Sequence, residues 1–261
     1  MLYFAALLLL LPLPLAVKGR CAAVMSATVF VIFSSLLAFH IICGEAATAL
    51  PEVQFLQSFF VANNGAHWQW KSESMYGPPW NFSQAIDLIN PCGDGWQGLI
   101  CSAESGVCLG MGETCHIREI NLNLYEIRGP FPAGLESLSQ LTKINFEVNS
   151  ITGTLPEALF TMDTLQVIQL GDNHMEGPIS SNIGQLTNLE VFNFELNWFS
   201  QSLPVEIGNI IPLNSLILHD NIMTGVVPAE LGNCVNLLRL DLENNFFHGE
   251  ALVRVCTMKC V

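Results

Sequence analysis

The most regular feature of the chain is a repeat of apolar and polar positions every 24 residues. An asparagine recurs with no insertion or deletion at Asn149, Asn173, Asn197, Asn221 and Asn245. Tyr125 occupies the same phase one repeat earlier. Around each asparagine the sequence follows L-x-x-L-x-L-x-x-N-x-L-x-G-x-L-P, as it does from Leu141 to Pro156. A repeat of this length predicts one strand and a short return per coil, so the coils stack as a solenoid.

Apolar residues two positions apart mark the strand of each repeat. Examples are Ile144 with Phe146, Ile168 with Leu170, and Phe192 with Phe194. Side chains two apart in a strand share a face, so we expect these pairs to fill the interior and the residue between them to face outward. The asparagine that follows should satisfy backbone groups left unpaired by the bend, and successive asparagines should form a ladder.

The return half of each repeat is rich in glycine and proline. Glycine stands at Gly129, Gly153, Gly177, Gly225 and Gly249, and proline at Pro132, Pro156, Pro204 and Pro228. These residues suit a tight turn followed by a stretch that needs no amide donor. Leu159, Met162 and Leu165 are then expected to close the coil on the convex side. Gln201 replaces the glycine and Ser180 the proline in their repeats, which predicts less regular turns there.

Residues 50–115 have a different composition, with Trp68, Trp70, Trp80, Trp96 and four cysteines. A terminal coil exposes its apolar interior, so a solenoid needs an end cap, and this region fits that role. Residues 51–62 predict a short helix with Phe55, Phe59 and Val61 partly buried. The turn residues Asn63, Asn64 and Gly65 end it.

Three runs carry a family resemblance: FLQSFFVANNGAHW, NPCGDGWQGLIC and HIREINLNL. Together with the 24-residue period, they resemble the N-terminal cap and repeats of plant-type leucine-rich-repeat proteins, over about 200 residues. That class includes receptor-like proteins, receptor kinases and polygalacturonase inhibitors. The resemblance implies a right-handed α/β solenoid with a curved parallel sheet, an irregular or 3-10 convex side and a helical, disulfide-bonded cap. The chain departs from the pattern by a longer spacing between Cys92 and Trp96, and by a second cysteine pair.

The expected domain order is a leader at 1–49, the cap at 50–115, six repeats at 116–250, and a tail or truncated repeat at 251–261. The leader contains two apolar runs, 2–17 and 22–43, separated by Lys18 and Arg20. Ala47-Thr48-Ala49 fits a signal-peptide cleavage pattern, which predicts secretion, with Met25 as a candidate true start. The second run is also long enough for a signal anchor that holds the protein at the cell surface. Both readings stay open.

An oxidising compartment favours disulfides between close cysteines, here Cys92 with Cys101 and Cys108 with Cys115. Four cysteines allow three connectivities, and a zinc site that includes His116 is a minor alternative. Cys234 is expected to be a buried free thiol. Asn81 begins the one N-x-S/T sequon after the leader and is a candidate glycosylation site.

Without residues 1–49 the chain has seven lysines and arginines against 22 aspartates and glutamates, a formal charge of −15. This charge repels nucleic acid and anionic lipid, so we expect basic or neutral protein or peptide partners, and membrane association only through an uncleaved leader. The same charge is also consistent with a role in solubility alone. No cofactor or metal is expected.

The outward strand positions form two columns that are candidates for ligand binding on the concave face. The first column is Asn121, Asn145, Gln169, Asn193, Ile217 and Asp241, and the second includes Glu147, Glu195, His219 and Glu243. With strands about 4.8 Å apart, they tile a surface about 25 Å long, enough for an extended peptide or a protein edge. The alternative function is a structural or surface scaffold with no dedicated ligand.

Glu147 and Glu195 lie two coils apart, near the carboxylate separation of inverting glycosidases. We nevertheless predict no enzyme activity. On an open face no pocket is expected to raise the pKa of either carboxyl, and His219 with Asp220 lacks a nucleophile at matching depth.

Overall fold

The computed structural model describes residues 47–103, 108 and 114–249. These residues fall in one unit, Ala46–Val261. Nearly all of the predicted leader and the tail, with Cys256 and Cys260, lie outside the described residues. Within the described ranges, no helix has both the length and the apolarity to cross a bilayer.

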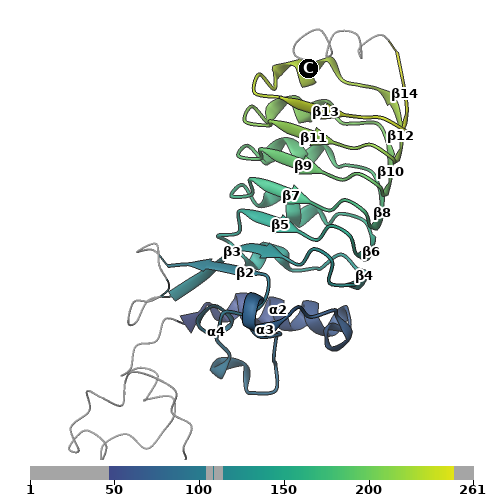
Figure 1. The fold of residues 1–261 in the computed structure, drawn as a ribbon. Helices are drawn as coiled ribbons and strands as arrows, with labels where there is room; N and C mark the ends of the chain where they lie inside the picture. The colour runs from purple at the N-terminus through teal and green to yellow at the C-terminus, as the bar shows by residue number, and fades with distance from the viewer. Residues whose placement is uncertain (1–46, 104–107, 109–113, 250–261) are drawn as a thin grey trace, which may run out of the picture. The chain divides into compact units, whose positions relative to one another are not determined.

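The main sheet has the order β1-β3-β5-β7-β9-β11-β13, in which β1 precedes the cap and each coil contributes one of the other strands (Figure 1). The strands are β1 (Ala47–Thr48), β3 (Thr114–Asn121), β5 (Lys143–Asn145), β7 (Val167–Gln169), β9 (Val191–Asn193), β11 (Ser215–Ile217) and β13 (Arg239–Asp241). They run parallel, while β2 (Leu99–Ser102) pairs antiparallel with β3. From β3 onward the register steps by 24 residues, as in Ile144 opposite Ile168, so each buried residue stacks on its equivalent in the next coil.

The interior and the asparagine ladder are confirmed. Ile144 and Phe146 are fully buried, as are the equivalent pairs in the following two coils. Asn197 shows the ladder contact: its Nδ2 donates to the carbonyl of Leu170 in the preceding coil at 2.9 Å, and its Oδ1 accepts from the amide of Met175 at 2.9 Å. The side chain therefore ties each coil to its neighbour with hydrogen bonds that the bent backbone cannot make by itself.

A second, lateral sheet runs along the side of the solenoid in the order β14-β12-β10-β8-β6-β4 (Figure 1). Its strands are β4 (Arg128–Pro130), β6 (Ser150–Gly153), β8 (His174–Gly177), β10 (Trp198–Gln201), β12 (Ile222–Val226) and β14 (Phe246–His248). The sequence pattern predicted one strand per repeat and missed this one. Its residues follow the ladder asparagine, where the expected turn masks a short alternation of exposed and buried positions.

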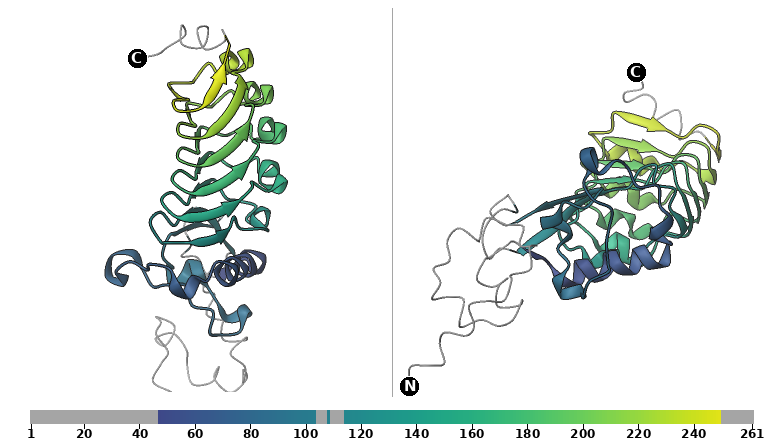
Figure 2. Two further views of the ribbon diagram at one scale, coloured as in Figure 1. Left: turned by 90° about the vertical axis from the view of Figure 1, so that its right-hand side faces the viewer. Right: turned by 60° about the horizontal axis from the view of Figure 1, so that its bottom comes forward.

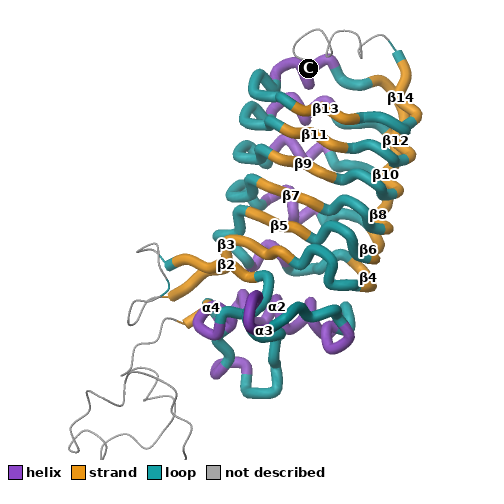
Figure 3. Tube along the Cα trace, viewed as in Figure 1, coloured by secondary structure: helices purple, strands orange, loops and turns teal. Residues whose placement is uncertain are grey.

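The convex side carries short 3-10 helices, as predicted (Figure 3; Figure 2, left). They are η4 (Leu135–Ser137), η5 (Glu157–Thr161), η6 (Ser181–Gln185), η7 (Val205–Asn209) and η8 (Ala229–Asn233). Leu159, Met162 and Leu165 are buried beneath this side and close their coil. The apolar residues of the return stretch therefore complete the core that the strand residues begin.

The two irregular turns predicted at Gln201 and Ser180 are wrong. Gln201 adopts a left-handed φ of 65°, close to the 85° of Gly153 at the equivalent position. Ser180 has φ −64° and ψ 147°, like Pro204, and its hydroxyl accepts a hydrogen bond from the Asn182 amide. Pairing with the coils on both sides fixes the backbone path, so tertiary context outweighs the local preference of one residue.

The cap consists of α2 (Leu50–Ala62), η2 (Gly65–His67), α3 (Glu73–Tyr76), η3 (Ile86–Leu88) and α4 (Pro91–Asp94). Phe55 and Phe59 are buried, but Val61 is 72% exposed, so its predicted burial is wrong. Two helical positions turn the side chain by about 200°, which points Val61 away from the face that Phe59 buries. Phe59 contacts Phe146 with ring centroids 5.5 Å apart, so α2 seals the first coils.

Both predicted disulfides are present, Cys92 with Cys101 and Cys108 with Cys115. Their sulfur atoms are bonded to each other, so the alternative zinc site has no thiolates to use. Cys234 is a buried free thiol, as expected, and its Sγ lies 3.4 Å from the Ile207 carbonyl. Burial raises the pKa of this thiol to about 11, which keeps it protonated and unreactive.

Candidate binding face

The main sheet places the two predicted columns on one face. Adjacent strands keep their register, so Asn145, Gln169 and Asn193 lie side by side on β5, β7 and β9. The next outward position, two residues further along the chain, brings Glu147, Gly171 and Glu195 into a second row. Parallel pairing at a constant offset therefore converts a sequence period into a continuous surface.

Glu147 is the centre of an amide network on this face. Its Oε1 accepts hydrogen bonds from Asn193 Nδ2 at 2.9 Å and Gln169 Nε2 at 3.4 Å, and its Oε2 from Asn123 Nδ2 at 3.5 Å. Partial burial raises the pKa of Glu147, and the nearby charge of Glu195 raises it further. The open face was expected to lack a pocket that raises the pKa of either carboxyl; packed neighbours desolvate Glu147 and raise its pKa without a closed pocket.

Glu195 leans over Gly171. A Cβ placed on Gly171 would meet Glu195 Cγ at 2.9 Å, so glycine at this position leaves the room that the glutamate occupies. On the other side, Glu195 Oε2 lies 2.8 Å from His219 Nε2. Glu195 thus spans the space between the preceding coil and the following one.

His219 is held between two carboxylates. Its Nδ1 lies 2.7 Å from Asp220 Oδ2, and its Nε2 contacts Glu195. Partial burial lowers the pKa of His219, but the hydrogen bond to Asp220 and the charges of Asp241 and Glu195 outweigh it, so the net shift is upward from 6.5. With both ring nitrogens facing carboxylate oxygens, the doubly protonated imidazolium satisfies both contacts.

We expect the Glu195→Gln substitution to lower the titration midpoint of His219, because it removes one of the charges that favour the imidazolium. Two-dimensional NMR of the ring resonances measures that midpoint, and Glu230→Gln on the convex side serves as the control. Because the folded pKa is raised, the contact stabilises the fold fully below about pH 6.5 and is lost as the pH rises through the folded pKa. An unchanged midpoint in Glu195→Gln would contradict this description.

The face is less accessible than the sequence predicts. Asn145, Asn193 and Ile217 are 8%, 5% and 5% exposed, so the expectation that the whole first column is open is wrong for these three residues. The side chains of these asparagines hydrogen-bond to nearby backbone: Asn145 Oδ1 accepts from the Glu147 backbone amide, and Asn193 Oδ1 accepts from the Glu195 backbone amide. Asn121 and Glu243 are exposed, while Gln169, Glu147, Glu195, His219 and Asp241 are half-buried. Their role in ligand binding stays a prediction.

The strongly charged residues of the central coils are all acidic. Between Lys143 and Arg239 the chain has ten aspartates and glutamates and not a single lysine or arginine. Within the described residues, neither Glu147 nor Glu195 forms an ion pair with a lysine or arginine; the one such pair there joins Lys143 and Glu119. Lys143 on β5 and Arg239 on β13 are outward strand residues at the two ends of this stretch, so the uncompensated negative charge is confined to the central coils, around Glu147 and Glu195.

Sequence reasoning missed a row of exposed apolar side chains on the lateral sheet. Trp198, Ile222 and Phe246 are 54%, 47% and 65% exposed. Each is the residue directly after a ladder asparagine, so the 24-residue period already contained the signal. It was overlooked because the position was assigned to a turn.

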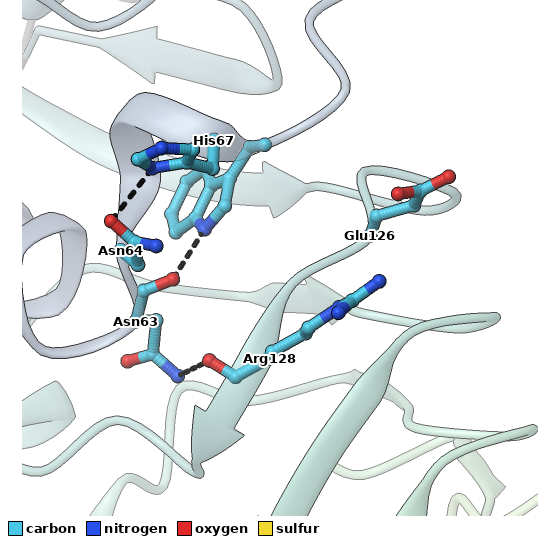
Figure 4. Close-up of a pocket in the computed structure, with 6 residues that line it drawn as sticks. Asn63, Asn64, His67, Glu126 and Arg128 are labelled. Atoms are coloured by element: carbon cyan, nitrogen blue, oxygen red, sulfur yellow. Dashed lines mark hydrogen bonds between the residues drawn. The ribbon is translucent and has the colours of Figure 1, made fainter.

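A pocket of about 270 Å³ lies at the junction of the cap and the first coil, lined by Asn63, Asn64, His67, Trp68, Glu126 and Arg128. Figure 4 shows these side chains in close-up. Asn63 Nδ2 donates to the Arg128 carbonyl at 3.1 Å, and Trp68 Nε1 donates to the Asn63 carbonyl at 2.9 Å. The bond from Asn63 to Arg128 joins the cap to the first coil, and the bond from Trp68 fixes Asn63 within the cap, so the pocket is part of a structural joint. It lies apart from the two predicted columns.

Asn81 lies on the surface of the cap, as a glycan acceptor requires. Its side chain is exposed, and its Oδ1 accepts a hydrogen bond from the Ser83 amide at 3.0 Å. Glycosylation of Asn81 stays a prediction.

Known proteins share this architecture. No family model matches the chain. A segment of 107 residues is 29% identical to the leucine-rich repeat receptor-like serine/threonine-protein kinase RGI4 of Arabidopsis thaliana. This segment is 41% of the chain but 9% of that kinase.

Two solved structures share the fold. The ectodomain of the receptor kinase SOBIR1 from Arabidopsis thaliana aligns with a TM-score of 0.62 at 18% identity, over 77% of this chain and 97% of that one. The ectodomain of the Arabidopsis receptor kinase HAESA, solved with an IDA peptide hormone ligand, aligns with a TM-score of 0.57 at 26% identity. That match covers 75% of this chain and 29% of HAESA's.

The stacked coils, the asparagine ladder and the disulfide-bonded cap define a leucine-rich-repeat solenoid. The chain shares this fold with the ectodomains of plant receptor kinases and is similar to them in sequence over part of its length.

Proposed function

We propose that this protein is an extracellular, non-catalytic recognition module that binds a basic peptide or protein segment on its concave face. The observation that carries the proposal is the pair Glu147 and Glu195 on the concave face, neither of which forms an ion pair with a lysine or arginine within the described residues. Charge complementarity of this kind steers a basic ligand toward the face and disfavours acidic ones.

The geometry supports a ligand with an extended backbone. Six strand positions at about 4.8 Å give a row about 25 Å long, which matches about seven residues of extended peptide. Glu147 and Glu195 repel each other across Gly171, and this repulsion contributes to the raised pKa of Glu147. A lysine or arginine placed between them relieves that repulsion, which adds to its binding energy.

The comparisons agree with a peptide ligand. The HAESA ectodomain, 26% identical to this chain, was solved with a bound peptide hormone. The disulfides of the cap fit an extracellular compartment, where such bonds persist. Glu147 is hydrogen-bonded to side-chain amides on an open sheet, and Glu195 is paired with His219, so both carboxylates are engaged by their neighbours, which supports a binding role over a catalytic one.

Selection from a random peptide display library tests the proposal. We expect the wild-type chain to enrich peptides rich in lysine and arginine, and the Glu147→Lys/Glu195→Lys/Glu243→Lys variant to weaken their binding at least about 100-fold, since close charge pairs contribute several kcal/mol in total. The matched control is Glu136→Lys/Glu206→Lys/Glu230→Lys, an equal charge change on the convex helices, which should retain binding.

Two outcomes would overturn the proposal. Equal loss in the concave and convex variants would show that net charge, and not this face, attracts the peptides. Failure of the wild-type chain to enrich any saturable peptide would favour the alternative of a structural spacer.

A further inference from the structure

The lateral sheet carries a second surface, which we call the lateral apolar column and define as His174, Trp198, Ile222 and Phe246. These residues occupy the same position in four consecutive coils, one residue after the ladder asparagine. The rings of His174 and Trp198 meet edge to face, with centroids 5.5 Å apart, so these two members of the column touch. Figure 1 shows their strands β8, β10, β12 and β14 stacked along one side.

The fold does not need apolar side chains at this position. The residue that follows each column member turns inward, and Met175, Phe199 and Met223 are fully buried there. The preceding coil carries Ser150 at the column position, and this serine begins β6 just as the column members begin their own strands. Packing of the core therefore does not require the apolar residues at this position in the later coils.

The column is a patch and not a set of isolated residues. Trp198, Ile222 and Phe246 are each about half or more exposed, and Val226, on the same outward side of β12 as Ile222, is 47% exposed. Leu196, at the edge between the lateral and concave faces, adds a further 46% exposed side chain. Contiguous exposed apolar surface of this kind marks interaction sites more often than single exposed residues do.

Acidic groups border the column. Glu176 lies opposite Trp198 in the pairing of β8 with β10. Asp172 and Asp220 occupy the coils on either side of Leu196, and their backbones hydrogen-bond to the segment that contains it. The two other titratable groups on the lateral strands of these coils are the column member His174 and His248 on β14.

The charge of the chain discriminates between possible partners for this surface. A second copy of this chain would bring the same acidic border and a net charge of −14, so like-charge repulsion opposes self-association. We propose that the lateral apolar column docks a different protein, whose contact surface combines apolar side chains with lysine or arginine. This surface is separate from the concave face and does not depend on the ligand proposed there.

The test uses the full chain and two synthetic helical peptides. One peptide has a leucine face bordered by lysines, and the other has glutamate in place of each lysine. The test variant is Trp198→Ser/Phe246→Ser, and Trp198→Ser alone is a milder version. The control is Val61→Ser, which removes an exposed apolar side chain from the cap. Because all three residues face solvent, we expect these variants to fold.

Fluorescence anisotropy should show saturable binding of the lysine peptide. We expect the double variant to weaken it about 10-fold or more, as loss of an aromatic anchor does, and Val61→Ser to leave it unchanged. The glutamate peptide should bind at least about 10-fold more weakly than the lysine peptide.

Three results would overturn the proposal. The first is wild-type affinity in the double variant. The second is loss of binding in Glu147→Lys/Glu195→Lys/Glu243→Lys but not in the column variants, which would place the peptide on the concave face. The third is a dimer in sedimentation velocity that Trp198→Ser dissociates, which would make a second copy the occupant.

Discussion

Replacing Phe59 with alanine is expected to lower the free energy of unfolding by about 3–5 kcal/mol, the usual range for removal of a buried aromatic ring. Phe59 is 2% exposed, and its ring contacts those of Trp68, Trp80 and Phe146 with centroids 5.1, 6.1 and 5.5 Å away. The substitution therefore opens a cavity where the cap meets the first coils. Urea unfolding followed by tryptophan fluorescence measures the change.

Val61→Ala is the control for the Phe59 substitution, because it shortens an apolar side chain of the same helix that is 72% exposed. We expect a change within about 0.5 kcal/mol for this surface position. Equal destabilisation by the two variants would show that helix α2, and not the aromatic cluster, is the sensitive feature.

Asn197→Ala is expected to cost about 2–4 kcal/mol, because several buried backbone groups lose their partner at once. Asn197 is 3% exposed. Its Nδ2 donates to the carbonyls of Leu170 and Glu195, and its Oδ1 accepts from the Met175 amide. Hydrogen exchange should show the largest loss of protection in the two coils that flank the substitution.

Asn188→Ala provides the comparison for Asn197. Asn188 is exposed and makes one hydrogen bond of 2.8 Å, to the Asp163 carbonyl. Its loss should be nearly neutral, since water replaces the partner. A cost similar to that of Asn197→Ala would mean that the ladder has no special weight in the stability of the solenoid.

Most of the fold could be predicted because one period repeats six times. Every repeat encodes the same coil geometry, so an atypical residue in one repeat can be interpreted from the equivalent residues in the others. The exceptions are positions where contacts with the adjacent coils determine the backbone conformation. Gln201 adopts the left-handed backbone angle of a glycine because the coils beside it impose that path. The lateral strands are short and follow a turn signal, so their alternation was hidden.

The candidate site was only partly predictable. The columns follow from strand alternation, and the pairing of strands brings Glu147 and Glu195 into one row as expected. Burial of Asn145 and Asn193 was not foreseen, since it depends on how side chains of adjacent coils hydrogen-bond across the sheet. The clamp of His219 between Glu195 and Asp220 likewise depends on side-chain orientation, which periodicity does not encode.

The central claim is that the concave face binds a basic peptide. The most direct measurement is photo-crosslinking with a lysine- and arginine-rich peptide obtained from the display selection, carrying a photoreactive residue at its centre. Mass spectrometry then locates the cross-linked residues. We predict cross-links to the segments around Glu147, Glu195 and His219. Cross-links confined to the convex helices η5 to η8 or to the cap would contradict the account.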